Sequence, residues 1–165
     1  MCAHVTSWNK NTSVKFRTDV ASMCKLGFDI GLKDMTADEL AYCQDAVANW
    51  KRLQPAIMDG DQYRLVSPYE TNHMAVNYVS KDQKKAVLFA YDVYPRFQEK
   101  LINVKLQGLD PNKTYKVEEI NLMPGVDSAL KSNGQTYTGD YLMKVGIEVF
   151  GFAATQSHVL ELTAM

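Results

Sequence analysis

The segment from residue 102 to residue 122 has the pattern of two short strands joined by a proline turn. Apolar residues, among them Val104 and Leu106, alternate with polar ones, as in a strand with one buried face. Asp110 and Pro111 predict the turn, because proline fixes φ and the aspartate side chain can cap the turn backbone. A lone hairpin cannot bury its apolar face, so this segment predicts an antiparallel β-sandwich.

The chain changes character near Asp59 and Gly60, after which strand patterns dominate. Residues 85–91 are apolar on both faces, which predicts a central strand covered on both sides. The further strands are expected at 63–66, 73–80, 141–149 and 158–162. The shared core between the two sheets is expected to contain Val87, Phe89, Val104, Leu106 and Val117.

The first part of the chain has helical patterns instead. Thr18 is expected to begin a short helix that Gly27 ends, since glycine favours the position after a helix. Thr36 and Glu39 form a capping-box pattern before a longer amphipathic helix, which Pro55 is expected to kink or end. Two such helices do not make an independent core, so they must pack on the β region or on something outside the chain.

Composition excludes several classes of protein. The formal net charge is −1, so there is no basic surface for nucleic acid or an anionic membrane. No segment resembles a membrane span or a signal peptide, and a cytoplasmic location is favoured over others. The three cysteines form no C-x-x-C pair, and no metal or cofactor motif occurs. We therefore expect no cofactor and no metal.

Candidate catalytic groups are few, and none forms a convincing site. Asp59 and Asp61 flank a glycine, which is more typical of a loop that ends a helix than of a metal site. Adjacent residues on a strand point to opposite faces, so Glu118 and Glu119 cannot act together on one bond. The remaining candidates lack partners in the sequence: Asp19 and Asp29, which flank a short apolar segment, and the isolated histidines His4, His73 and His158.

An aromatic platform for sugar rings is a further possibility at Tyr91, Tyr94 and Phe97. Packing in the core or at a sheet edge explains the same residues better, because aromatic side chains dominate protein cores. The residues alone therefore predict a helical segment followed by a β-sandwich, with no catalytic residue assigned.

Several segments, in order, resemble the bacterial α-galactosidases of glycoside hydrolase family 36. The family patterns resemble GAHVS, GxFGYEL, GDxYRL and GxxLMxxGL, although Cys2 replaces the first glycine and Phe28-Asp29-Ile30 stands where the family has Tyr-Glu-Leu. The matching residues here are Ala3-His4-Val5, Phe16-Arg17, Leu26 to Ile30, Gly60 to Leu65, Leu109-Asp110-Pro111 with Tyr115, and Gly139 to Met143 followed by Gly146.

The resemblance implies an enzyme several times longer, with an N-terminal β-supersandwich, a catalytic (β/α)₈ barrel and a C-terminal sandwich. Its two catalytic aspartates lie upstream of the segments matched here, so none is assigned to this chain. Residues 1–57 are then the helical end of the barrel and residues 58–165 the sandwich. Under this resemblance the chain is a fragment or a truncated gene product, non-catalytic alone, which meets an α-galactoside only through the missing barrel.

Two expectations follow for the first region. An alternative function, a stand-alone carbohydrate-binding or interaction module, is less compatible with an amphipathic helix beside a complete sandwich. If residues 1–57 once completed a barrel, part of their apolar surface is uncovered and favours self-association. The side chains concerned are Val5, Trp8, Phe16, Leu40, Val47 and Trp50.

Overall fold

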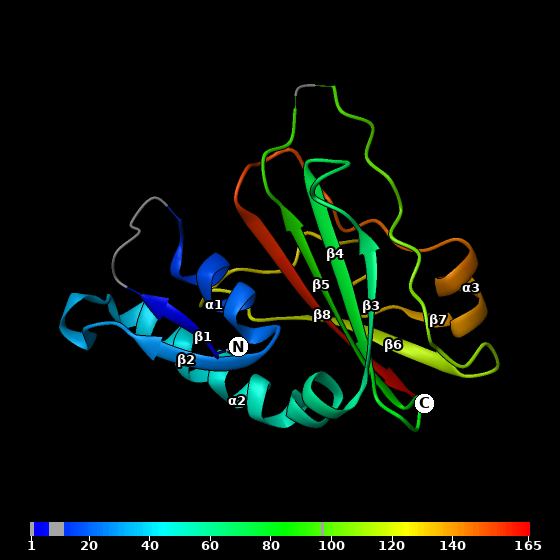
Figure 1. Ribbon diagram of the computed structural model, residues 1–165, viewed down its shortest axis with the longest axis horizontal. Helices are drawn as coiled ribbons and strands as arrows, with labels where there is room; N and C mark the ends of the chain where they lie inside the picture. The colour runs from blue at the N-terminus through cyan, green and yellow to red at the C-terminus, as the bar shows by residue number, and fades with distance from the viewer. Residues whose placement is uncertain (1, 7–11, 97) are drawn as a thin grey trace.

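A computed structural model describes residues 2–6, 12–96 and 98–165 (Figure 1). Its main element is a six-stranded antiparallel sheet with the strand order β3-β4-β5-β8-β6-β7. The antiparallel β domain expected from the sequence, preceded by a helical segment, is therefore confirmed. The strands are β3 (Asp61–Val66), β4 (His73–Val79), β5 (Lys85–Asp92), β6 (Thr114–Ile120), β7 (Thr136–Thr138) and β8 (Gln156–Ala164).

The central strand β5 is covered on both faces, as its sequence predicts. Leu88 and its even-numbered neighbours pack on one side, in the same core cluster as Val104, Leu106 and Val117. Val87 and Phe89 are also buried, but they pack on the other side, against α2 (Ala37–Asp59). The expectation that all five share one core is wrong, because alternate residues of a strand point to opposite faces.

The layer that covers the Leu88 face of this sheet consists mainly of extended chain. Val104 pairs with Ile147 in an isolated antiparallel bridge, while β6 pairs with β8 and β7. The predicted hairpin within residues 102–122 is therefore wrong in its pairing. Each half of the predicted hairpin pairs instead with residues outside 102–122.

The predicted strand at 141–149 is also wrong, because this stretch begins inside α3 (Gly139–Lys144). The Thr138 side chain accepts a hydrogen bond from the backbone N–H of Tyr141 and caps the helix. After the helix the chain turns at Gly146, whose φ of +79° suits glycine. It then continues as extended chain through Ile147.

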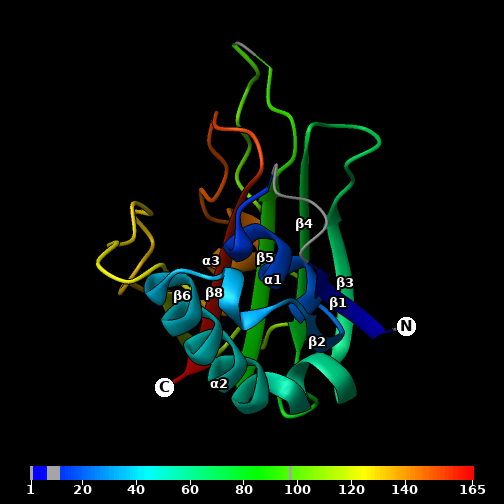
Figure 2. The ribbon, with the colours of Figure 1, turned by 90° about the vertical axis from the view of Figure 1, so that its left-hand side faces the viewer.

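The N-terminal region, residues 2–59, alternates strands and helices on one side of the sheet (Figures 1 and 2). Its elements are β1 (Cys2–Thr6), α1 (Val14–Ser22), β2 (Lys25–Asp29), the short 3-10 helix η1 (Leu32–Asp34) and α2. β1 and β2 are parallel, with Thr6 opposite Asp29. The expected all-helical segment therefore also contains two parallel strands.

The first expected helix is displaced along the chain. Ser13, not Thr18, caps α1 by accepting a hydrogen bond from the backbone N–H of Phe16. Thr18 is instead buried inside the helix, and Gly27 lies within β2. Pairing with β1 explains the strand, because tertiary contacts override weak local propensity.

The second helix begins as predicted and ends later. Thr36 and Glu39 form the expected capping box at the start of α2. Pro55 lies inside the helix, which continues to Asp59. Burial of Ala56 and Ile57 against the sheet offsets the hydrogen bond that proline removes.

Candidate functional site

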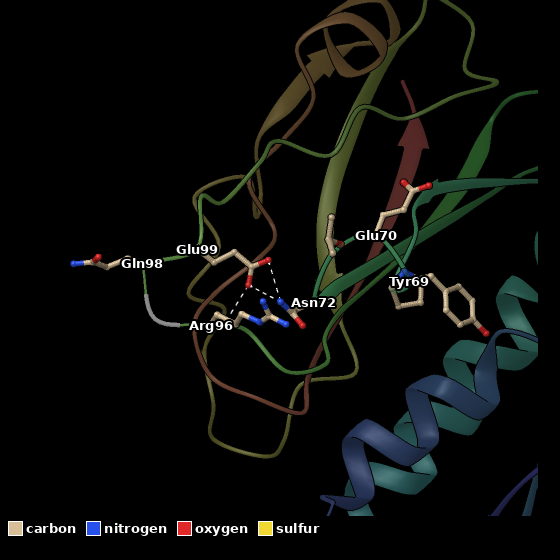
Figure 3. A pocket seen from close by; sticks show the side chains of 8 residues that line it. Tyr69, Glu70, Asn72, Arg96, Gln98 and Glu99 are labelled. Atoms are coloured by element: carbon tan, nitrogen blue, oxygen red, sulfur yellow. Dashed lines mark hydrogen bonds between the residues drawn. The ribbon is translucent and has the colours of Figure 1, made fainter.

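An open pocket of about 580 Å³ lies between the turn that joins β3 to β4 and the loop that follows β5 (Figure 3). Most of its lining is polar, with carboxylate, guanidinium, amide and hydroxyl groups. Pocket-sized concave sites with convergent polar groups are the usual places for small ligands. The lining residues are Pro68, Tyr69, Glu70, Thr71, Asn72, Arg96, Gln98 and Glu99.

Glu99 ties the two loops of this pocket together. The Asn72 side-chain amide donates to both carboxylate oxygens of Glu99, at 3.1 and 3.3 Å. The backbone N–H of Arg96 donates to the same carboxylate at 3.0 Å, as Figure 3 shows. These hydrogen bonds, that of Arg96 first, hold the pKa of Glu99 below its ordinary value. The carboxylate is therefore ionised and fixed in place at neutral pH.

A buried histidine lies next to the Glu99 carboxylate. His73 Nδ1 is 2.7 Å from Asp92 Oδ1, and its ring stacks on Phe150. Burial raises the pKa of Asp92, although the backbone N–H of Gly151 and His73 favour its ionised form. His73 Nε2 is 3.8 Å from Glu99 Oε2 and has no hydrogen-bond partner among the residues that the structure describes. A buried pair of polar side chains, His73 and Asp92, therefore lies beneath the Glu99 side of the pocket.

A second polar cluster, centred on a buried carboxylate, joins the N-terminal region to the sheet. Asp19, on α1, is completely buried and accepts four side-chain hydrogen bonds. The donors are Lys15 at 2.6 Å, Ser157 at 2.7 Å, Asn121 at 2.9 Å and Tyr42 at 3.1 Å. We call these five residues the Asp19 cluster. They come from α1, α2, β8 and the residue after β6, so the cluster links both regions.

The Asp19 cluster has the chemistry of a structural joint. Burial, together with the Asp19 carboxylate, raises the pKa of Tyr42 well above its ordinary value, so its hydroxyl stays a donor. A buried carboxylate with several donors is well stabilised, and removal of one side of such a cluster is costly. In the sequence only Lys15, four residues before Asp19, signals this cluster.

The other acidic candidates do not converge on a site. Glu118 is exposed and Glu119 buried, so the prediction that they point to opposite faces is confirmed. Glu119 contacts His158 at 2.6 Å and also accepts a hydrogen bond from Ser128. Asp61 pairs with Lys81 on the surface. Across residues 2–6, 12–96 and 98–165, no cluster of three His, Cys, Asp or Glu side chains could hold a metal ion.

Tyr91 packs in the core, as preferred over an aromatic platform for sugar rings. Tyr91 is buried and its hydroxyl donates to the Asp19 carbonyl at 2.9 Å. Tyr94 is exposed, and Phe97 lies outside the described residues. Of the three histidine candidates, His4 lies in β1. Trp8, from the first region, lies outside the described residues, as Phe97 does. No described helix has the length and apolar character needed to cross a membrane.

Comparison with known proteins identifies the family. The model of the glycosyl hydrolase family 36 C-terminal domain matches residues 73–162. The chain belongs to glycosyl hydrolase family 36. This family 36 chain is 34% identical, over 136 residues, to the probable alpha-galactosidase C of Aspergillus flavus.

Solved structures agree over the full length of the chain. The GH36 alpha-galactosidase AgaB from Geobacillus stearothermophilus is 28% identical, with a TM-score of 0.84 over 100% of this chain. A variant of AgaA from the same organism, solved in complex with stachyose, is 27% identical with a TM-score of 0.83, also over 100% of this chain.

This family 36 chain spans only a minor part of its relatives. The match to the Aspergillus flavus protein covers 82% of this chain and 16% of that protein. The match to each Geobacillus structure covers 22% of the Geobacillus chain. Within the chain, residues 73–162 match the C-terminal domain of the family.

Proposed function

We propose that the chain is the C-terminal portion of an α-galactosidase, where it supports the catalytic barrel and supplies no catalytic group of its own. Supporting this, the matched family domain is the C-terminal domain of glycosyl hydrolase family 36, and the similar proteins are α-galactosidases. By the family resemblance, the reaction is hydrolysis of a terminal α-galactoside with retention. Retaining glycosidases need two carboxyl groups about 5 Å apart.

The N-terminal region carries the proposal. Its order β1-α1-β2-α2 has two parallel strands, each followed by a helix. This is the repeating unit of a (β/α)₈ barrel, in which every strand also pairs with a neighbour on each side. Within the described residues β1 and β2 pair only with each other. We infer that residues 1–57 are the last units of such a barrel and that residues from 58 onward form the supporting domain.

The Asp19 cluster gives the supporting domain a defined role. It fixes α1 and α2 to β8 through buried hydrogen bonds. In the longer enzyme this joint would hold the last barrel units in register with the rest. Active sites of such barrels lie at the carboxyl ends of the strands, so the joint acts on the site by positioning the strands.

An activity assay tests this proposal. The purified chain is incubated with an aryl α-galactoside beside a longer gene product that includes the coding sequence upstream of Met1. We expect turnover by the longer product and none by the chain. Turnover by the chain that persists after removal of host enzymes contradicts the proposal.

An apolar groove supports a second proposal, which concerns the chain by itself. Side chains of β2, η1 and α2 line a groove of about 340 Å³, with little polar surface. Leu32 in this groove is 67% exposed. We propose that in isolation a second copy of the chain covers it, since stable monomers rarely expose large apolar patches. The lining residues are Phe28, Ile30, Leu32, Met35, Cys43, Gln44 and Val47.

The alternative of a stand-alone carbohydrate-binding or interaction module fits the N-terminal region less well. Such a module has no need for two parallel strands beside a complete sheet domain.

Of the apolar residues expected to be uncovered, Val5 is fully buried, Leu40 is 37% exposed, and Phe16, Val47 and Trp50 are half-buried.

A further inference from the structure

The pocket between the β3–β4 turn and the loop after β5 has features that the supporting role does not use. It lies on the sheet domain and shares no lining residue with the Asp19 cluster. Two carboxylates and one guanidinium line it, with amide and hydroxyl groups between them. Apart from Pro68 and the ring of Tyr69, its lining offers little apolar surface. This chemistry disfavours lipids and other apolar ligands.

Several groups in the pocket are free to bind. The Arg96 guanidinium and the Glu70 carboxylate make no hydrogen bond or ion pair within the described part of the chain. Tyr69 is 98% exposed, so its ring is uncovered. Opposite charges on the same rim disfavour strongly anionic and strongly cationic ligands alike, and they leave neutral polar ligands as the best match.

The clamp around Glu99 makes part of the pocket rigid. Its carboxylate is held by Asn72 and Arg96 and lies beside buried His73. Figure 3 shows Glu99 and Tyr69 on opposite sides of Asn72. A ligand that contacts both therefore needs hydroxyl groups at one end and an apolar ring face at the other. Fixed polar groups bind at a lower entropic cost than mobile ones.

We propose that this pocket binds a neutral oligosaccharide. Hydroxyl groups of one sugar ring would bond to Glu99, Asn72 and Arg96, and an adjacent ring would stack on Tyr69. Aromatic side chains suit this role because they offer an apolar face together with a polar tip. The inference goes beyond the proposed function and does not depend on it, since it involves binding without bond cleavage.

Saturation-transfer difference NMR on the purified chain tests the proposal, with stachyose as the probe and galactose for comparison. We expect saturable transfer to stachyose and a weaker response to galactose, because one ring cannot contact both sides. Tyr69→Ala is expected to raise the Kd for stachyose about tenfold, within the range for loss of one stacked ring. Because Tyr69 is exposed, its replacement should leave the stability of the fold almost unchanged.

Tyr94→Ala is the matched control, because Tyr94 is also exposed and lies on the loop after β5, which carries Arg96 and Glu99, but outside the pocket lining. It should leave the Kd for stachyose unchanged. Arg96→Gln, which removes the free charge and keeps hydrogen-bonding groups, should weaken binding less than Tyr69→Ala. No saturable transfer to stachyose, or equal loss in Tyr69→Ala and Tyr94→Ala, would overturn the proposal. Because no step requires hydrolysis, these results are independent of the activity assay.

Discussion

The sheet domain and the N-terminal region differ in how far each covers its own apolar surface. In the sheet domain, β5 is buried on both faces, and two core clusters enclose its side chains. In the N-terminal region, β1 and β2 pair only with each other within the described residues, and Leu32 stays exposed in an apolar groove. This difference is what we expect if the N-terminal region is part of a larger structure, as we propose.

The Asp19 cluster is where the N-terminal region is attached to the sheet. A region with open strand edges gains little stability from its own contacts, so its attachment to the sheet determines whether it stays folded. Asp19 supplies that attachment through donors on α1, α2 and β8. Stability of the N-terminal region should therefore depend on buried polar bonds, and stability of the sheet on apolar packing.

The largest expected effect comes from loss of the joint. Asp19→Ala leaves the partly buried Lys15 ammonium and three other donors without the Asp19 carboxylate as acceptor. We expect a loss of about 4 kcal/mol in the free energy of unfolding, as for other broken buried charge clusters. Urea unfolding measures the loss, and hydrogen exchange should show α1 and β2 opening before β5.

Asp45→Ala, at an exposed position of α2, is the control and should change stability by less than about 0.5 kcal/mol. Equal protection of both regions in Asp19→Ala would show that the cluster is no joint.

A smaller effect is expected inside the sheet domain. Gly146 has a φ of +79°, and a Cβ there would overlap the carbonyl oxygen of Val104. Gly146→Ala should cost about 3 kcal/mol by thermal unfolding, from backbone strain plus disruption of the bridge to Ile147.

Gly125→Ala separates the two causes. Gly125 has a similar φ of +74°, but nothing lies near its Cβ position. It should cost only about 1 kcal/mol, the strain alone. Similar losses in both variants would mean that close packing of Gly146 on Val104 contributes nothing.

The hydrogen-bonded contact between Glu119 and His158 should make stability depend on pH. Burial tends to raise the pKa of Glu119, but hydrogen bonds from His158 and Ser128 outweigh it and leave this pKa below its ordinary value. A lowered carboxyl pKa stabilises the fold above the unfolded pKa, about 4.3, and this contribution disappears as pH falls through the lower folded pKa.

Glu119→Gln should therefore cost about 2 kcal/mol at neutral pH, and its difference from wild type should shrink in acid. Denaturant unfolding across the acid range measures both quantities. Glu118→Gln, which alters the exposed pair with Lys116, should have almost no effect at any pH. A difference for Glu119→Gln that grows in acid has the wrong sign for this account.

The smallest effect is expected at the start of α2. Thr36→Ala removes the side-chain acceptor of the capping box and should cost about 1 kcal/mol. Thr36→Ser keeps the acceptor and should match wild type in thermal unfolding. If the two variants are equally stable, the cap contributes nothing measurable in the N-terminal region.

Local patterns in the sequence predicted the elements that local forces determine. The capping box at Thr36 and Glu39 was readable because both partners lie within one helical turn. The double apolar character of β5 likewise predicted its central position. The family resemblance supplied the barrel expectation, which the parallel pair β1 and β2 now supports.

Long-range partners were not predictable from one sequence. Asn121 and Ser157 lie 102 and 138 residues from Asp19, and no local pattern connects them. Val104 pairs with Ile147 instead of its local neighbour for the same reason. The pocket at Glu99 depends on two loops meeting, which only the sheet order β3-β4-β5 brings about.

Sedimentation velocity over a wide range of protein concentration tests most directly whether the N-terminal region is incomplete. We expect the wild-type chain to associate as concentration rises, and Leu32→Lys to remain monomeric because a charge then lies in the apolar groove. Val126→Lys, at an exposed apolar position outside the groove, should associate like wild type. A wild-type chain that stays monomeric at every concentration would contradict the account, since its N-terminal region would then need no further cover.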